Sequence, residues 1–158
     1  MQRGYIAITS HDWIENIKKQ KVNKAVFWRK KSTFKAIEKG DFFYFFSKET
    51  TGNIRKIIGR GTLSNVEMLN VKELWEKYGV STGYECEEML EKEIETIYGN
   101  SDFLLGCIVL ENISFFKRRI LVNECGITFL PGIVSGKTIS QEEVRKIEII
   151  AGGDYDYE

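Results

Sequence analysis

The sequence has few of the residues that most often build enzymatic or metal sites. Its 158 residues include one histidine, one proline and three cysteines. A lone His11 excludes a metal site of the H-E-x-x-H kind, and no serine or cysteine nucleophile motif accompanies it. Cys86, Cys107 and Cys125 are odd in number and lack C-x-x-C spacing, so we expect reduced, mostly buried thiols. We expect no catalytic constellation, metal or cofactor.

Long hydrophobic runs and a signal-peptide core are also missing. No apolar stretch approaches the ~20 residues that span a bilayer. The N-terminus, MQRGYIAITSHDW, reaches charged residues before it builds an apolar core. We therefore expect a cytoplasmic protein without a membrane partner. With 42% hydrophobic residues, the chain predicts one compact domain over residues 1–150 and a frayed acidic tail over residues 151–158.

The formal net charge is zero, but the two signs are divided along the chain. Residues 1–66 carry 14 Lys or Arg and 5 Asp or Glu, a balance of +9, whereas residues 67–158 carry 9 against 18, a balance of −9. A basic segment suits a polyanion, because phosphate contacts supply most non-specific affinity for nucleic acids. The alternative is a solvated lysine-rich surface without a partner, and charge alone favours neither.

A glycine motif near the C-terminus has the order of a phosphate-binding loop. In GITFLPGIVSGKTISQEEVRK, an apolar run leads to GKT and then to a helix start. The loop of nucleotide hydrolases has four residues between its glycines, but only three separate Gly132 from Gly136. Such a loop also precedes a parallel sheet, and 21 residues remain after Lys137. A nucleotide-binding enzyme is therefore the least favoured hypothesis.

Hydrophobic periodicity predicts an α+β fold, a barrel-like sheet of about six strands with about three or four helices packed outside it. The apolar segment 41–46 should be a central strand. Gly59 and Gly61 indicate a bulge or a close backbone approach, and two capping boxes are expected, at Asp12–Glu15 and Ser140–Glu143. The predicted strands are 4–9, 24–28, 41–46, 54–69, 101–116 as one strand or a pair, 118–122 and 126–130. The predicted helices are 12–21, 71–79, 84–99 and 141–147.

Tryptophans near cations are the most informative feature. Trp28 ends a predicted strand directly before the basic triplet RKK, and Trp13 follows the polar SHD at a junction between strand and helix. Aromatic faces beside cations hold a flat base against its charged backbone, with stacking worth about 1–3 kcal/mol per base. Core packing is the alternative for each ring. It is favoured for Trp13 and Trp75, which lie in amphipathic helix patterns, and base stacking is favoured for Trp28.

A series of short motifs spans most of the chain in a fixed order. AVFWRKKSTFKAIEKGDFFYFF, IIGRGTL, LWEKYGVSTG, LLGCIVLENISFF and FLPGIVSGKTI follow one another. Together they resemble the EVE-type domain of the PUA-like superfamily, and more narrowly the version found at the N-terminus of HNH-type restriction endonucleases. The opening GYIAITS, followed by SHD and a strand that ends in Trp28, is also similar to YTH domains, the readers of methylated adenine in the same superfamily.

The resemblance implies a twisted β-barrel of EVE/YTH type whose pocket receives one flipped-out modified base. Trp28 would then form one wall of an aromatic cage, with Trp13, Trp75 and Tyr84 as candidates for a second wall. Other residues would touch the base edge or line the pocket, namely Ser10, Asp12, Phe45, Phe46 and Ser47. The nucleic-acid backbone would be bound by residues of the basic half and of the GKT segment, namely Arg29, Lys30, Lys31, Arg55, Lys56, Arg60, Ser135 and Lys137.

The resulting hypothesis is a non-enzymatic DNA-binding reader module. It would flip methylcytosine or hydroxymethylcytosine, or as a second option methyladenine, into an aromatic pocket and act as the targeting part of a modification-dependent restriction system. A nuclease domain or subunit would be its partner, because the HNH arrangement has no counterpart in a chain with one histidine. A YTH- or ASCH-like RNA-binding module is the alternative.

Overall fold

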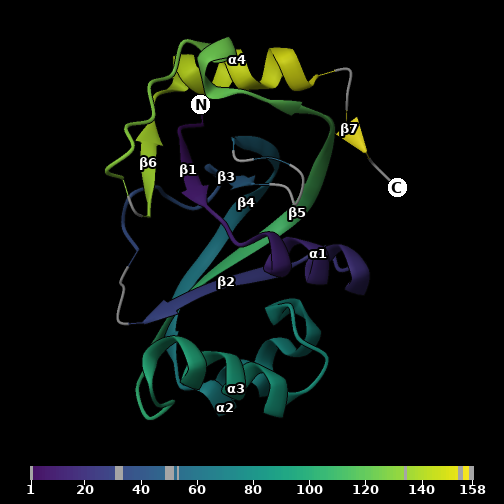
Figure 1. The fold of residues 1–158 in the computed structure, drawn as a ribbon, viewed down its shortest axis with the longest axis vertical. Coiled ribbons are helices and arrows are strands. Elements are labelled where there is room, and N and C mark those ends of the chain that lie inside the picture. Colours follow the sequence, from purple (N-terminus) through teal and green to yellow (C-terminus); the bar gives the residue numbers. More distant parts are fainter. Residues whose placement is uncertain are drawn as a thin grey trace. The chain divides into compact units, whose positions relative to one another are not determined.

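The computed structural model describes residues 2–30, 34–48, 52, 54–133, 135–152 and 155–156 (Figure 1). The chain divides into two compact units made of interleaved segments. Unit 1 comprises Met1–His11, Ala36–Leu63 and Asn112–Glu158, and unit 2 comprises Asp12–Lys35 and Ser64–Glu111. Both units combine strands with helices, which confirms the α+β class. In the described part of the chain, no helix is both long and apolar enough to cross a membrane.

Unit 1 is built on a mixed sheet in which the order of strands is β5, β4, β3, β1 and β6. β1 and β3 are parallel, and the β1–β6 and β3–β4 pairs are antiparallel. The two-residue β7 pairs with β5. The strands are β1 (Gly4–Ile8), β3 (Phe42–Lys48), β6 (Gly136–Ile139), β7 (Tyr155–Asp156) and the parts in this unit of β4 (Arg55–Leu69) and β5 (Leu105–Ile120). The 3₁₀ helix η2 (Val122–Cys125) and helix α4 (Gln141–Ala151) complete it.

The apolar segment β3 is central in this sheet, as its sequence predicts. Every residue from Phe42 to Ser47 is buried, because β3 has neighbours on both edges and apolar side chains on both faces. Tyr44 places its polar end at α4, where its hydroxyl donates to Glu148 Oε2 at 2.7 Å. The core of unit 1 therefore forms between β3 and the C-terminal segments.

Gly59 confirms both expectations for the glycine-rich strand. The β3–β4 register shifts at this point, since Phe45 pairs with Gly59 while Phe46 pairs with Ile57. A Cβ atom on Gly59 would lie 2.4 Å from the carbonyl oxygen of Ser114 in β5. The backbones of β4 and β5 thus approach too closely for any side chain at this position.

Unit 2 has three strand segments and three helices. β2 (Ala25–Lys30) pairs antiparallel with the first half of β5, and the last part of β4 belongs to this unit as well. Its apolar core is formed by buried side chains that include Val26, Leu74, Leu90 and Ile94. The helices are α1 (His11–Gln20), α2 (Val71–Tyr78) and α3 (Glu87–Tyr98), with the 3₁₀ helix η1 (Gly79–Thr82) between the last two.

Three local expectations are wrong. α1 begins at His11, so Asp12 lies in its first turn and does not cap it. Residues 118–122 are not a separate strand, because β5 continues unbroken from Leu105 to Ile120. Residues 126–130 form no strand, and the next strand is GKTI itself, β6. By contrast, Ser140 and Glu143 form the predicted capping box at the start of α4.

The three cysteines are free thiols, and their exposure differs. Cys107 and Cys125 are buried, whereas Cys86 is half-buried at the start of α3. Burial raises the pKa of the Cys107 thiol to about 12, and burial is also the main cause of a raised pKa at Cys125. Because the thiolate is the reactive form, both buried cysteines should be inert in the folded protein.

We expect a thiol-specific chromogenic reagent at about pH 8 to label Cys86 rapidly in the native protein and the other two cysteines only after unfolding. Absorbance measured with and without denaturant gives the number of reactive thiols in each state. The Cys86→Ser variant is the control, and it should lose the rapid phase. A rapid phase that persists in this variant would contradict the burial of the other two thiols.

Candidate functional site

The end of β2 (Trp28–Lys30), which we call the β2 end, carries the tryptophan and the cations that the sequence singles out. Successive strand residues point to opposite faces, so Val26, Trp28 and Lys30 share one face and Arg29 lies on the other. Exposure rises along the strand, since Val26 is buried, Trp28 and Arg29 are half-buried and Lys30 is exposed. The β2 end therefore presents an aromatic ring and two cations where the core of unit 2 meets solvent.

Trp28 is half-buried at the edge of the core of unit 2. Its neighbour is Tyr84, with ring centroids 6.3 Å apart and planes inclined by 46°. Among the described residues, the buried indole Nε1 of Trp28 has no hydrogen-bond partner. Burial, with smaller contributions from the Glu93 and Asp12 carboxylates, raises the pKa of Tyr84, so its hydroxyl stays neutral. Tyr84 is thus the candidate second wall that contacts Trp28.

The other two candidate walls have packing roles. Trp13 is 6% exposed and meets Phe27 edge to face, with ring centroids 5.6 Å apart. A Cβ atom on Gly83 would lie 3.0 Å from Trp13, so the indole is also enclosed on that side. Trp75 is half-buried on α2 and packs against the core of unit 2. Asp12, which the resemblance assigns to the base edge, is exposed on α1.

Both cations of the β2 end lie over aromatic rings. The Arg29 guanidinium is 5.5 Å from the centre of the Phe34 ring. The Lys30 ammonium is 4.6 Å from the centre of the Phe103 ring and 5.8 Å from that of Tyr98. The Lys30 backbone N–H also donates to the Tyr98 hydroxyl at 3.1 Å. These contacts hold the cations in place without neutralising their charge.

The remaining basic residue of this stretch, Lys31, lies outside the described residues.

The pocket candidates of β3 belong to unit 1 and are core residues there. Phe45, Phe46 and Ser47 are all 5% exposed or less. The Phe46 ring packs on Phe129 with centroids 4.6 Å apart. Ser10, directly after β1, is exposed. Within unit 1, these β3 side chains are therefore buried in protein contacts.

The basic candidate residues of unit 1 differ in their ion pairing and burial. Arg60 donates from Nε and Nη2 to the Glu148 carboxylate at 2.9 and 3.0 Å, and its guanidinium lies 4.0 Å from the centre of the Phe42 ring. This bidentate pair neutralises the charge of Arg60 and argues against a phosphate contact. Arg55 and Lys56 are half-buried at the start of β4.

The GKT segment is part of the sheet of unit 1. Lys137 lies in β6, and its ammonium donates to the Thr128 carbonyl at 2.5 Å. The Ser135 carbonyl accepts from the Ile8 N–H at 2.9 Å. The next helix begins only after Ser140, so the glycines do not lead into a helix N-terminus as those of a phosphate-binding loop do.

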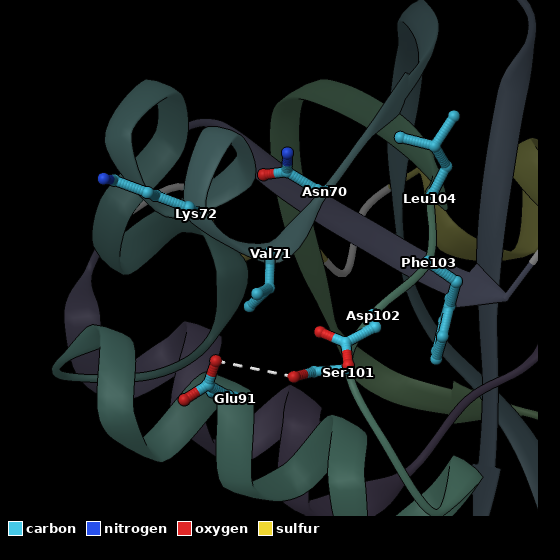
Figure 2. A pocket seen from close by; sticks show the side chains of 8 residues that line it. All are labelled: Asn70, Val71, Lys72, Glu91, Ser101, Asp102, Phe103 and Leu104. Atoms are coloured by element: carbon cyan, nitrogen blue, oxygen red, sulfur yellow. Dashed lines mark hydrogen bonds between the residues drawn. The ribbon is translucent and has the colours of Figure 1, made fainter.

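A hollow of about 380 Å³ in unit 2 contains none of the residues that the sequence singles out (Figure 2). It lies at the start of α2, beside the segment that precedes β5 and one residue of α3. We call it the unit-2 hollow, and its lining residues are Asn70, Val71, Lys72, Glu91, Ser101, Asp102, Phe103 and Leu104. The Asn70–Glu73 capping box is a sequence signal for the start of α2, but no sequence signal indicates the cavity.

The described residues contain no cluster of three or more His, Cys, Asp or Glu side chains that could hold a metal ion.

No protein-family model matches the sequence, and no curated protein sequence matches it either. Solved protein structures do match this chain. The crystal structure of ASCH from Zymomonas mobilis has a TM-score of 0.69 and 15% sequence identity, covering 93% of this chain and 94% of that one. A tyrosine-to-phenylalanine variant of the same protein has a TM-score of 0.70 and 16% identity, covering 94% and 99%. A serine-to-alanine variant has a TM-score of 0.69 and 15% identity, covering 94% and 96%.

Agreement over this much of both chains, at this level of identity, establishes the fold. The expected PUA-like architecture is confirmed, and the narrower assignment to the EVE type is not confirmed. The chain has the fold of the ASCH structures from Zymomonas mobilis.

Proposed function

We propose that this chain is a nucleic-acid-binding module that holds one base against Trp28. The observation that carries the proposal is the β2 end, where a half-buried tryptophan stands beside two cations. A base stacks on the face of such a ring, and the cations beside it are placed for the phosphates. The PUA-like fold supports this proposal, because the related EVE, YTH and ASCH domains imply nucleic-acid binding.

The cations of the β2 end would bind the backbone of the nucleic acid. Lys30 and Arg29 are each supported by aromatic rings, so less side-chain freedom is lost when a phosphate binds. Neither is paired with a carboxylate in the ion pairs of the described residues. Phosphate contacts of this kind position a nucleic acid without reading its sequence.

The ligand that we favour is DNA with a modified base, methylcytosine or hydroxymethylcytosine before methyladenine. Taking a base out of a stack costs a few kcal/mol, and less where pairing is already weak. One methyl group in an apolar contact supplies only about 1–3 kcal/mol of discrimination. Trp28 with Tyr84 would supply that apolar contact, and the module would deliver a nuclease partner to modified DNA without catalysing a reaction itself.

An RNA-binding module is the second candidate, and the likeness to ASCH structures favours it. The two candidates share the stacking on Trp28 and the phosphate contacts. They differ in the sugar, because an RNA-binding site uses the 2′-hydroxyl as donor and acceptor.

Titration of the whole chain with fluorescently labelled oligonucleotides tests the proposal. One sequence is prepared as single-stranded and duplex DNA and as RNA, with cytosine, methylcytosine, hydroxymethylcytosine, adenine or methyladenine at the centre. We expect modified DNA to bind about five- to tenfold more tightly than unmodified DNA, as one methyl contact allows. Tighter binding of matched RNA would instead favour the second candidate. Absence of binding to every oligonucleotide would overturn the proposed function.

A further inference from the structure

We propose that the unit-2 hollow is a second nucleoside subsite, which takes the base next to the one at Trp28 and selects bases that carry an exocyclic amino group. This inference rests on the proposed function and adds a sequence preference to it. Three observations support the inference. They are the size and lining of the hollow, the hydrogen-bond acceptors on its walls, and the one residue that contacts both the hollow and the β2 end.

The size and the lining of the hollow suit a small aromatic group. Its volume of about 380 Å³ lies in the range of small-molecule sites, about 300–1,000 Å³. Val71, Phe103 and Leu104 supply apolar surface, and Leu104 is 50% exposed although it is a large apolar side chain. The hollow therefore combines an apolar surface with polar groups beside it, as a nucleobase requires.

Of the five polar side chains of the hollow, two accept hydrogen bonds only, two can donate and accept, and Lys72 only donates. Glu91 and Asp102 contribute carboxylates, and the Ser101 hydroxyl donates to Glu91 Oε2 at 3.4 Å. The Lys72 side chain extends away from these groups (Figure 2). Acceptors on a protein match the amino groups of adenine, cytosine and guanine, whereas thymine and uracil lack such a group. A negatively charged hollow also repels phosphate, so the group that enters it should be the uncharged base.

Phe103 connects this hollow with the β2 end. Its side chain lines the hollow, and its ring also lies beneath the Lys30 ammonium at 4.6 Å. Lys30 is therefore placed to bind the phosphate between a base in the hollow and a base at Trp28. The positive charge of Lys30 also disfavours a polyamine or a basic peptide as the ligand, although the carboxylates of the hollow alone would attract one. A nucleotide can donate from its amino group to the Asp102 carboxylate and place its phosphate at Lys30.

Competition between flanking bases tests the subsite. The probes are short single-stranded DNAs with one central methylcytosine, flanked on both sides by adenine or by thymine. We expect the whole chain to bind the adenine-flanked DNA about tenfold more tightly, as one or two base-edge hydrogen bonds allow. In Asp102→Asn this preference should disappear or reverse, because the new amide N–H can donate to the thymine O4. A loss of folding would lower both affinities and leave their ratio unchanged.

Glu95→Gln is the matched control. Glu95 is exposed on α3 outside the hollow, so this variant loses the same charge and should keep the wild-type preference. Equal affinity of the wild type for both probes would overturn the subsite while the proposed function stands. Displacement of either probe by spermidine that occurs with the wild type and not with Asp102→Asn would also overturn the subsite, because the hollow would then be a cation site. Failure of the wild type to bind any DNA or RNA would overturn the proposed function as well.

Discussion

Replacing Trp28 by alanine should weaken binding of the preferred oligonucleotide roughly 5- to 150-fold, because stacking of one base on an aromatic side chain is worth about 1–3 kcal/mol. The loss should be similar for modified and unmodified bases if the ring supplies stacking alone. If the ring also forms the wall against the methyl group, the preference for the modified base should fall too. Fluorescence anisotropy on both probes separates the two effects.

Two comparisons make this result specific. Trp28→Phe keeps an aromatic face with a smaller ring, so it should retain part of the stacking and lose less affinity than Trp28→Ala. Because Trp28 also packs at the edge of the core of unit 2, thermal unfolding of each variant must accompany the titrations. Binding is then measured well below the unfolding midpoint. Wild-type affinity in a folded alanine variant would remove Trp28 from the site.

Replacing Gly59 by alanine should destabilise the protein by about 3 kcal/mol or more, at the upper end of overpacking effects. The added Cβ atom would lie 2.4 Å from the Ser114 carbonyl oxygen and 3.0 Å from the Phe115 Cα atom. Both are backbone atoms of β5, so relief requires movement of a whole strand and not of one side chain. Urea unfolding measures the change as a lower midpoint at an unchanged slope.

Two other glycines calibrate this result. A Cβ atom on Gly132 meets no atom within 4 Å, so Gly132→Ala should stay within about 0.5 kcal/mol of the wild type. A Cβ atom on Gly136 would meet the end of the Tyr5 ring at 2.4 Å, and a side chain can move more easily than a strand. We expect Gly136→Ala to fall between the other two variants. Equal stability of the Gly59 and Gly132 variants would contradict the close approach of β4 and β5.

Local sequence signals predict the elements that depend on local physics. The capping box at Ser140 and the central strand β3 follow from neighbouring residues alone. The segment GITFL has strand-forming residues but no strand, because Ile127 enters the core of unit 1 from an irregular segment. By contrast, β6 is a strand at a position where the sequence predicts none. It starts at Gly136, where the missing side chain leaves room for Tyr5, and that contact is invisible in the sequence.

In the candidate site, too, contacts between chain neighbours can be predicted from the sequence, whereas contacts between distant residues cannot. Trp28, Arg29 and Lys30 are neighbours in the chain, so their association at one strand end is readable from the sequence. The contact between Trp28 and Tyr84 joins residues from different elements, and periodicity disfavoured Trp13 and Trp75 as walls without indicating that Tyr84 contacts Trp28. The pairing of Arg60 with Glu148 spans 88 positions and could not be predicted from local patterns. The unit-2 hollow likewise needs three separate segments to form.

The interleaving of the two units limits how the protein can be taken apart. The boundaries at Leu63–Ser64 and Glu111–Asn112 fall inside β4 and β5, so the two units cannot be separated without interrupting both strands. Neither unit is a continuous stretch of chain, so no truncation from one end isolates either of them. Gene fusions and inserted tags are therefore best placed at the chain ends, and deletion mapping should give an all-or-none loss of binding with no single minimal fragment.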